Sequence, residues 1–382
     1  MLLSEIRPLL EASEQIQVPA GQTIFKVGDA GLTMYLILNG EVEIRTAENQ
    51  LLDRLTAGQV FGEMALVDNQ ERSASATAVK TSTLAAINKE RFAALTQQLP
   101  SFATVVMAIM SSRLRRYMEE EVKRQRLEEE LAIGREIQLS LLPQEPPALP
   151  GWEFAAAYRP ARQVGGDLYD FIPDPDNPNL LHLVIADVTG KGVPAAMFMA
   201  MCRAIIRAAA LNGRSPANLL QRTNHLLLCE RRSWPFLTVF FASLNIQTGQ
   251  LTYATGGHEP PYWIQAADGR VEALPGRGML LGALPTIYVE EHTITLAPGD
   301  GLILYTDGLT EARCEEEMFG DGRLQALIAR LAQSSAEHLA QAILAGVTDF
   351  CGRTAQADDM TLVVVKRHPA AVAAGGPANS AA

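Results

Sequence analysis

Four acidic sites stand at or near the ends of predicted core strands in the second half of the chain: Asp167, Asp187, Asp307 and the adjacent pair Asp358 and Asp359. Strand ends of one sheet face the same edge, so we expect these carboxylates to converge. Carboxylates at that density repel one another and resist ionisation, and divalent cations would offset the repulsion. A purely oxygen ligand set favours Mg²⁺ or Mn²⁺ over zinc, which prefers Cys and His.

The chemistry that such a site would perform is hydrolysis of a phosphate ester. Two divalent ions ~3.5–4 Å apart lower the pKa of a bound water and supply hydroxide near neutral pH. The sequence contains no Ser-His-Asp order, Cys nucleophile or P-loop that would compete with this interpretation. An aspartate at a strand end is commonly a plain turn former. That is the better interpretation for any single one of these residues, but not for all four with adjacent glycines.

A second group of residues, near position 70, could bind phosphate. Gly62 permits a tight turn, and a short helix starting there would point its N–H groups at an anion. Arg72 could hold a phosphate through two hydrogen bonds, and Glu63 could accept a hydrogen bond from a ribose hydroxyl. On physical chemistry alone, a solvated Glu and Arg beside a turn is an equally good interpretation.

The first hundred residues alternate short strand patterns with glycines. The segments 33–38 and 41–45 flank Asn39-Gly40, which predicts a β-hairpin. Residues 76–87 indicate further strand. We therefore expect a small β-barrel or roll with helices at its ends.

Residues 102–142 predict one long helix. The segment has no Pro and a single glycine, and its apolar residues recur at helical spacing between blocks of charge. An apolar stripe between charged flanks indicates parallel pairing with a second copy, and hence a homodimer. The alternative is an exposed connecting helix. The stripe is irregular around positions 122–127, so it does not establish a regular heptad.

A second globular region of mixed strands and helices follows the prolines after position 142. A helix is expected over 194–210, another after Ser215-Pro216, and a third behind a capping box formed by Ser334 and Glu337. The expected organisation is therefore α+β and multidomain: a β-roll domain at 1–101, a linker helix at 102–142, a second globular domain at 143–367 and a disordered tail at 368–382.

Composition limits the partners and the compartment. The 382 residues carry 43 acidic and 32 basic side chains, a formal net charge of −11, which argues against nucleic acid as the main partner. The four Cys residues show no metal-binding spacing and fit a reducing cytosol. We find neither a signal peptide nor a run approaching the ~18 apolar residues of a membrane span, so a cytoplasmic protein without a membrane partner is expected.

The stretch from Phe61 to Leu66, followed by Glu71 to Ala74, closely resembles the phosphate-binding cassette of the cyclic nucleotide-binding domain family. The fit extends from Ala20 to Ser73. The resemblance implies that Glu63 binds the ribose and Arg72 the cyclic phosphate, while Gly62, Ser73 and Ala74 line the pocket. The run 71–74 is similar to the catabolite activator protein group, which favours cAMP over cGMP.

The rest of the chain resembles the metal-dependent serine/threonine protein phosphatase (PPM) family, in its bacterial sporulation and stress-response branch. The motifs that carry this resemblance occur in order at 136–143, 160–170, 187–192, 256–261, 305–312 and 358–361. The family fold is a β-sandwich flanked by helices. The resemblance implies that Asp167 and Asp187 bridge two Mg²⁺ or Mn²⁺ ions, that the Val188 carbonyl is a further ligand, and that Asp307 and Asp358 complete the site. Asp359 is expected to support its loop.

The resemblance also implies a regulated activity on a phosphoprotein. Relatives act on anti-sigma factor antagonists, which are STAS-type proteins, in partner-switching cascades. We therefore expect a cyclic-nucleotide-controlled phosphatase in which the linker helix orders the metal site. Two alternatives are a non-catalytic pseudophosphatase scaffold, which a missing metal carboxylate would favour, and a transcription factor, which would need a helix-turn-helix after the sensor.

Three further positions are left open. His258 is either a general acid, a donor to the site or, as we favour, structural. Lys191 either attracts the phosphorylated substrate or is solvated. Asn224 matches a family asparagine to which the sequence assigns no role.

Overall fold

The computed structural model describes residues 13–64, 70–98, 100–211, 215–229 and 235–369. They form two compact units, divided between Arg126 and Leu127. Helix α4 (Pro100–Leu141) runs across this division, so its first part is described with the N-terminal unit and its last part with the C-terminal unit. The expected disordered tail lies almost wholly outside the described residues.

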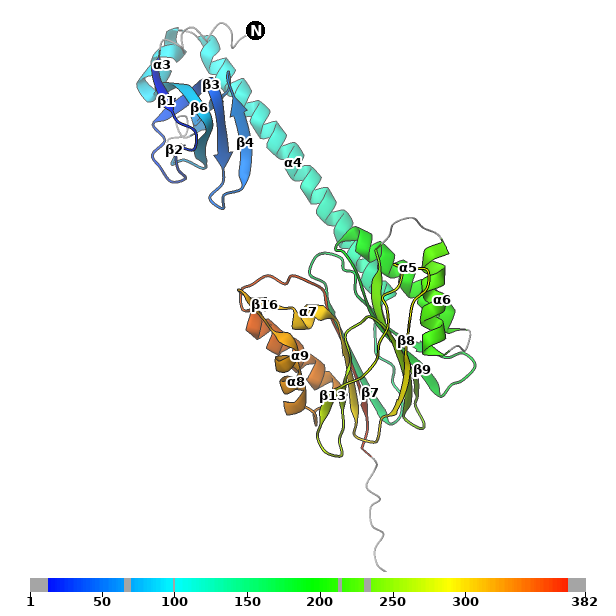
Figure 1. Cartoon of the computed structure of the whole chain (residues 1–382). Helices are drawn as coiled ribbons and strands as arrows, with labels where there is room; N and C mark the ends of the chain where they lie inside the picture. Colours follow the sequence, from blue (N-terminus) through cyan, green and yellow to red (C-terminus); the bar gives the residue numbers. More distant parts are fainter. Residues whose placement is uncertain (1–12, 65–69, 99, 212–214, 230–234, 370–382) are drawn as a thin grey trace, which may run out of the picture. The chain divides into compact units, whose positions relative to one another are not determined.

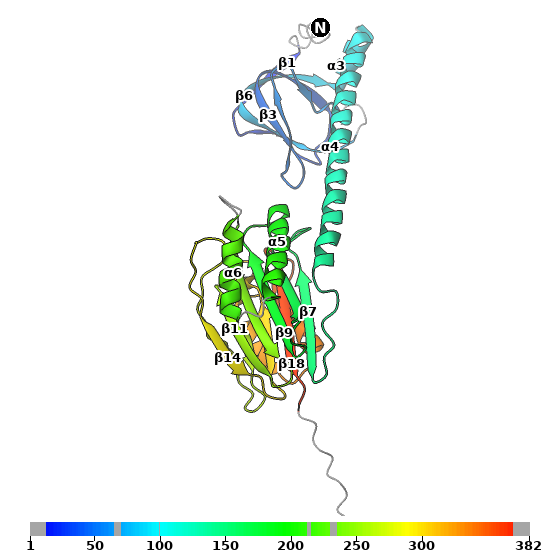
Figure 2. The ribbon, with the colours of Figure 1, turned by 90° about the vertical axis from the view of Figure 1, so that its right-hand side faces the viewer.

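The N-terminal unit is a β-roll with helices at its end, as expected (Figure 2). Its strands are β1 (Glu14–Val18), β2 (Thr23–Phe25), β3 (Thr33–Arg45), β4 (Leu51–Thr56), β5 (Val60–Phe61) and β6 (Ser75–Asn88). The sheet order is β1-β6-β3-β4, with β2 on β6 and β5 on β3. Helix α3 (Lys89–Gln98) and the start of α4 cover one end, where Phe102 and Val106 pack on Met34 and Ile87.

The predicted hairpin at Asn39-Gly40 was wrong. β3 continues through both residues as one strand, and β6 accompanies it along its length with register shifts between Ile37 and Val42. Gly40 has φ +105°, and a side chain there would clash with Ser82 of β6. The Asn-Gly pair therefore forms a bulge-like irregularity within one long strand instead of a turn. Strand β6 pairs with β3 on both sides of it.

The C-terminal unit stacks two five-stranded antiparallel sheets between two pairs of helices (Figure 1). One sheet contains β8 (Leu168–Pro173), β9 (Leu180–Val188), β10 (Leu237–Asn245), β11 (Gln250–Gly256) and β14 (Glu291–Thr295). The other contains β7 (Trp152–Arg159), β12 (Tyr262–Ile264), β13 (Val271–Ala273), β15 (Gly301–Tyr305) and β18 (Met360–Arg367). A short ribbon pairs β16 (Arg313–Cys314) with β17 (Glu317–Met318). This β-sandwich flanked by helices is the expected fold.

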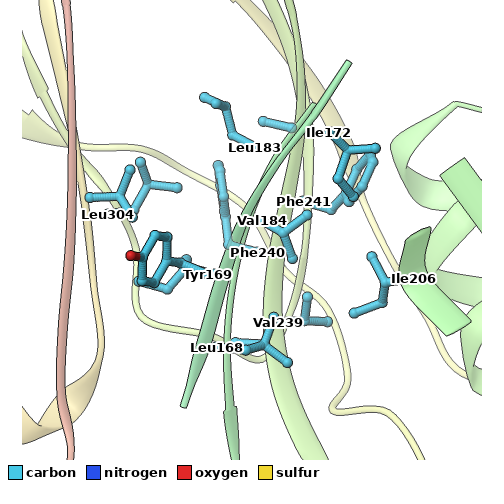
Figure 3. Close-up of a cluster of buried hydrophobic side chains, with 14 of the residues drawn as sticks. Leu168, Tyr169, Ile172, Leu183, Val184, Ile206, Val239, Phe240, Phe241 and Leu304 are labelled. Atoms are coloured by element: carbon cyan, nitrogen blue, oxygen red, sulfur yellow. The ribbon is translucent and has the colours of Figure 1, made fainter. Parts of the chain in front are cut away.

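The central strands β9, β10, β15 and β18 are buried on both faces because each sheet has a helix layer on one side and the other sheet on its second side. In Figure 3, Leu183 and Phe240 point toward Leu304 of the opposite sheet, and Val184 and Phe241 point toward Ile206 on α5 (Val193–Ala210). Helix α6 (Pro216–Cys229) lies beside α5, and α8 (Gly320–Arg330) and α9 (Ala336–Cys351) cover the second sheet. The continuous apolar runs in the sequence reflect this double burial.

Two helix expectations need correction. The third helix begins after Ser335, whose hydroxyl accepts the His338 N–H at 3.3 Å, and not after Ser334. The sequence was expected to contain no run long and apolar enough to span a membrane. Helix α5 alone has that length and composition, and α3 and α4 reach it only when they are taken together as one bent pair. In this unit α5 is a core helix: its apolar face packs on β8 and β9, and Arg203 and Arg207 bind the buried Asp170 of β8.

Candidate active site and ligand pocket

The predicted carboxylates come from both sheets of the sandwich and not from one. Asp167 directly precedes β8 and Asp187 lies near the end of β9, whereas Asp307 begins α7 (Asp307–Thr310) after β15 and Asp358 precedes β18. The expectation of a single sheet was therefore wrong. The carboxylates still share one region, because these strand ends lie at the same edge of the stacked sheets.

Two threonines join the sheets at this edge. Thr306 and Thr361 both donate hydrogen bonds from their hydroxyls to Asp167 Oδ2, at 2.7 and 2.5 Å. The Thr361 N–H in turn donates to Thr306 Oγ1 at 3.0 Å. Asp167 is 1% exposed and both threonines are fully buried. Neither threonine was predicted from the sequence, although each stands in one of the motifs at 305–312 and 358–361, because only the stacking of the sheets places them on Asp167.

The carboxylates raise one another's pKa. Burial, and then the negative charge of Asp187, raise the pKa of Asp167 well above its usual range. Burial, and then the charge of Asp307, raise the pKa of Asp187 to about 6. The pKa of Asp307 is raised by burial, Glu311 and Asp358, and the charge of Lys191 opposes them. The site therefore concentrates negative charge that the protein alone leaves largely uncompensated.

The donor set suits hard divalent cations. It consists of carboxylate oxygens and the Val188 carbonyl, whose oxygen lies 2.7 Å from the place where a side chain on Gly166 would start. Within the described residues, no group of three or more His, Cys, Asp and Glu side chains is drawn close enough to hold a metal ion as it stands. Mutual repulsion of the carboxylates and the oxygen chemistry nevertheless fit Mg²⁺ or Mn²⁺.

Asp359 shapes the loop that leads to Asp167. Its carboxylate accepts the N–H groups of Ala161 and Gly166, at 2.7 and 2.6 Å. A side chain on Gly165 would clash with this carboxylate, which explains why a glycine stands there. These contacts are those of a loop support.

The end of α4 contacts the same loop. Gln138 Nε2 donates to the Gly165 carbonyl at 2.6 Å, and its Oε1 accepts the Gly165 N–H at 3.0 Å. Gln138 is 4% exposed. Nothing in the sequence distinguishes Gln138 from the exposed polar residues around it on the helix, so this contact was not predicted.

The three positions left open now have contacts. His258 is buried and shares a 2.8 Å hydrogen bond between Nδ1 and the hydroxyl of Thr238. Burial lowers its pKa to about 4, so it is neutral at neutral pH. Asn224 accepts the Gly282 N–H at 2.8 Å and donates to the Leu284 carbonyl at 2.9 Å, and so fixes a loop. Lys191 forms an ion pair of 2.8 Å with Asp358.

The N-terminal unit contains a cavity of about 390 Å³, a size typical of small-molecule sites. All five residues predicted to bind nucleotide line it: Gly62, Glu63, Arg72, Ser73 and Ala74. Apolar side chains from β3, β4 and α4 line the rest, including Ile44, Leu55 and Leu114. The cavity therefore pairs a polar end with an apolar end.

The polar end has unused hydrogen-bonding capacity. Arg72 donates to the carbonyls of Gly62, at 2.7 Å, and Thr33, and its guanidinium lies 4.0 Å from the ring centroid of Phe25. The Arg72 Nε and Glu63 Oε2 atoms are buried without a hydrogen-bond partner. Buried polar atoms of this kind are costly unless a ligand or water pairs with them.

Helix α4 also contributes to this cavity, which the sequence analysis did not foresee. Arg113 donates to Glu63 Oε1 and to the Val60 carbonyl, both at 2.5 Å. Arg116 pairs with Asp53 at 2.6 Å, and Tyr117 lines the cavity. The predicted linker helix is thus also a wall of the pocket.

Comparisons with known proteins agree with both units. The family model described as Stage II sporulation protein E (SpoIIE) matches residues 177–368, and the cyclic nucleotide-binding domain model matches residues 15–99. Phosphoserine phosphatase RsbU of Bacillus subtilis is 31% identical over 246 residues, which cover 64% of this chain and 71% of that protein.

Two further matches concern single units. Cyclic AMP receptor protein of Thermus thermophilus is 42% identical over 101 residues, 25% of this chain and 47% of that protein. The solved SiaA-PP2C domain of Pseudomonas aeruginosa matches 64% of this chain and 98% of its own with a TM-score of 0.57 at 24% identity, which supports the fold. The chain therefore belongs to the SpoIIE family of PP2C-type protein serine/threonine phosphatases and carries a cyclic nucleotide-binding domain ahead of its phosphatase domain.

Proposed function

We propose that the chain removes phosphate from phosphoserine or phosphothreonine of a protein under the control of a cyclic nucleotide. The observation that carries the hydrolytic part is the buried Asp167, which Thr306 and Thr361 of the opposite sheet fix beside Asp187. Two Mg²⁺ or Mn²⁺ ions bound there would supply positive charge for the phosphate and activate water. Asp167, Asp187, Asp307, Asp358 and the Val188 carbonyl would hold these ions.

The chain's own residues supply position and rigidity. Thr306 and Thr361 hold one oxygen of Asp167, which fixes the orientation of the second oxygen. Asp359 holds the loop before Asp167 through two backbone N–H groups. All four predicted metal carboxylates are present, which argues against the pseudophosphatase alternative.

The sensing part rests on the cavity of the N-terminal unit. We assign the cyclic phosphate to Arg72, with Ser73 and Ala74 beside it, and the ribose to Glu63 beside Gly62. The unpartnered Arg72 Nε and Glu63 Oε2 atoms support this assignment. The relative named as a cyclic AMP receptor favours cAMP over cGMP.

Helix α4 is the proposed transmitter between the two activities. Arg113 near its start contacts Glu63, and Gln138 near its end contacts Gly165, two residues before Asp167. A ligand changes activity only if it binds the active and inactive states with different affinity. We propose that α4 also pairs with a second copy, since Leu114, Met118, Val122 and Leu127 expose apolar side chains along it.

The proposed substrate is a phosphorylated STAS-type anti-sigma factor antagonist in a cytoplasmic partner-switching cascade, in keeping with the RsbU-like relationship. The test is phosphate release from such a phosphoprotein with Mn²⁺, with and without cAMP or cGMP. Mn²⁺-dependent release that responds to one nucleotide supports the proposal. Calorimetric titration with each nucleotide identifies the ligand independently of activity.

A further inference from the structure

Lys191 lies in the loop between Asp187 and helix α5. Its ammonium is 2.8 Å from Asp358 Oδ2 and donates to the Ala357 carbonyl at 2.7 Å. The side chains of Lys191 and Asp358 are 41% and 38% exposed. These two contacts hold the ammonium of this side chain beside Asp358.

The same ammonium acts on a second carboxylate of the site. Its charge opposes the rise in the pKa of Asp307. Asp358, which this ammonium contacts, and Asp307 are the two carboxylates that complete the proposed metal set, while Asp167 and Asp187 come from the other sheet. Among the described residues, Asp358 therefore has an ion-pair partner within the chain, whereas no Lys or Arg forms an ion pair with Asp167 or Asp187.

We propose that Lys191 is an internal counter-ion of Asp358 that competes with the divalent cation held by Asp307 and Asp358. This inference rests on the proposed two-metal function. An ion that enters must separate Lys191 from Asp358 or share the carboxylate with it, so the ion pair weakens one of the two cation sites. In the metal-free protein the same ion pair reduces repulsion among the carboxylates.

The competition predicts opposite effects with and without metal. Replacing Lys191 by Met removes the competitor, so the weaker Mn²⁺ site should bind roughly three- to fivefold more tightly, as for the loss of a partly exposed ion pair. Without metal the same variant should unfold at a lower temperature, because the carboxylates lose their counter-ion. Since a ligand that binds the folded state stabilises it, saturating Mn²⁺ should shift the variant's Tm further than the Tm of the wild-type protein.

The test is calorimetric titration of the full chain with Mn²⁺, together with thermal unfolding in chelator and in Mn²⁺. Lys191→Arg keeps the charge and should bind Mn²⁺ like the wild type. Arg330→Met removes one exposed charge from α8 and is the control for net charge. An unchanged or weaker Mn²⁺ affinity in Lys191→Met overturns the inference while the two-metal function stands. A wild-type protein that binds no Mn²⁺ overturns both.

Discussion

Gln138 and Gly165 form two hydrogen bonds with each other, one in each direction, at 2.6 and 3.0 Å. Gln138 belongs to the last turns of α4, and Gly165 is separated from Asp167 by a single glycine. The same short loop is held from its other side by Asp359, which accepts the Gly166 N–H. The position of Asp167 therefore depends on a helix residue and on a carboxylate that does not itself need to bind metal.

Gln138→Leu should lower the phosphatase activity, although the two side chains have similar volumes. The variant leaves a buried N–H and carbonyl of Gly165 unpaired, which costs about 1–3 kcal/mol of stability and loosens the loop before Asp167. We expect a lower kcat and a Mn²⁺ affinity reduced by roughly tenfold, as for other groups that orient metal ligands. Gln125→Leu, at an exposed position of the same helix, is the matched control. Equal kcat and equal Mn²⁺ affinity in the two variants would show that the contact does not support the site.

Thr361→Val should affect metal binding without a large change in packing. The substitution keeps the side-chain shape and removes one of the two hydroxyl hydrogen bonds to Asp167 Oδ2. Because hydrogen bonds to the charged form favour ionisation, the variant should bind Mn²⁺ about 10- to 100-fold more weakly. Calorimetry measures this directly, and Thr348→Val on α9 serves as the control. If the variant binds Mn²⁺ as tightly as the wild type does, the Thr361 hydroxyl does not contribute to metal binding.

The metal-free protein should lose stability as the pH rises from about 4 to about 6. Burial and the neighbouring carboxylate raise the pKa of Asp187 to about 6, above its value in the unfolded chain. Such a carboxyl group contributes stability that is full below the unfolded pKa and is lost as the pH rises through the folded one. At about 1.4 kcal/mol per pKa unit, the loss is on the order of 3 kcal/mol.

Urea unfolding in chelator between pH 4 and 8 measures this loss. Asp187→Asn should flatten the pH dependence, and the exposed Asp349→Asn should leave it unchanged. Mn²⁺ should also flatten it, because the ion binds the ionised carboxylates. A stability that increases over this range in chelator would contradict the assigned electrostatics.

Arg72→Ala should abolish the response to cyclic nucleotide and leave Mn²⁺-dependent hydrolysis intact. The guanidinium is the cation assigned to the phosphate, and loss of charge-assisted hydrogen bonds of 1.5–3 kcal/mol weakens binding by roughly 10- to 100-fold. Arg54→Ala, whose side chain is exposed and pairs with Glu43, is the control. Calorimetric titration with cAMP and cGMP measures the affinity of each variant for the nucleotide. Undiminished binding to Arg72→Ala would contradict the assigned phosphate site.

The sequence located the strand-end carboxylates and residues that line the cavity of the N-terminal unit, but not how the elements pack. The ends of the apolar runs located Asp187 and Asp307 without any tertiary information. Their assignment to one sheet failed because adjacent strands of a sheet and facing strands of a sandwich give the same apolar pattern. The hairpin at Asn39-Gly40 failed because local turn preference competes with a long partner strand, β6, that local sequence does not reveal.

The residues that sequence reasoning missed share a physical cause. Thr306, Thr361 and Gln138 act through hydrogen bonds to residues 139, 194 and 27 positions away. Arg113 reaches Glu63 across 50 positions. No spacing rule connects such pairs, because each contact exists only after sheets and helices have packed.

Asp307→Asn tests whether the carboxylate set carries out the hydrolysis. The substitution keeps the size of the side chain and removes one charge from the set. Phosphate release from a protein carrying phosphoserine should require Mn²⁺ or Mg²⁺ in the wild type and fall by at least ~100-fold in the variant, while Asp349→Asn keeps full activity. Release that persists in Asp307→Asn, or in the wild type in chelator, would show that the carboxylates and their metal ions do not carry out the hydrolysis.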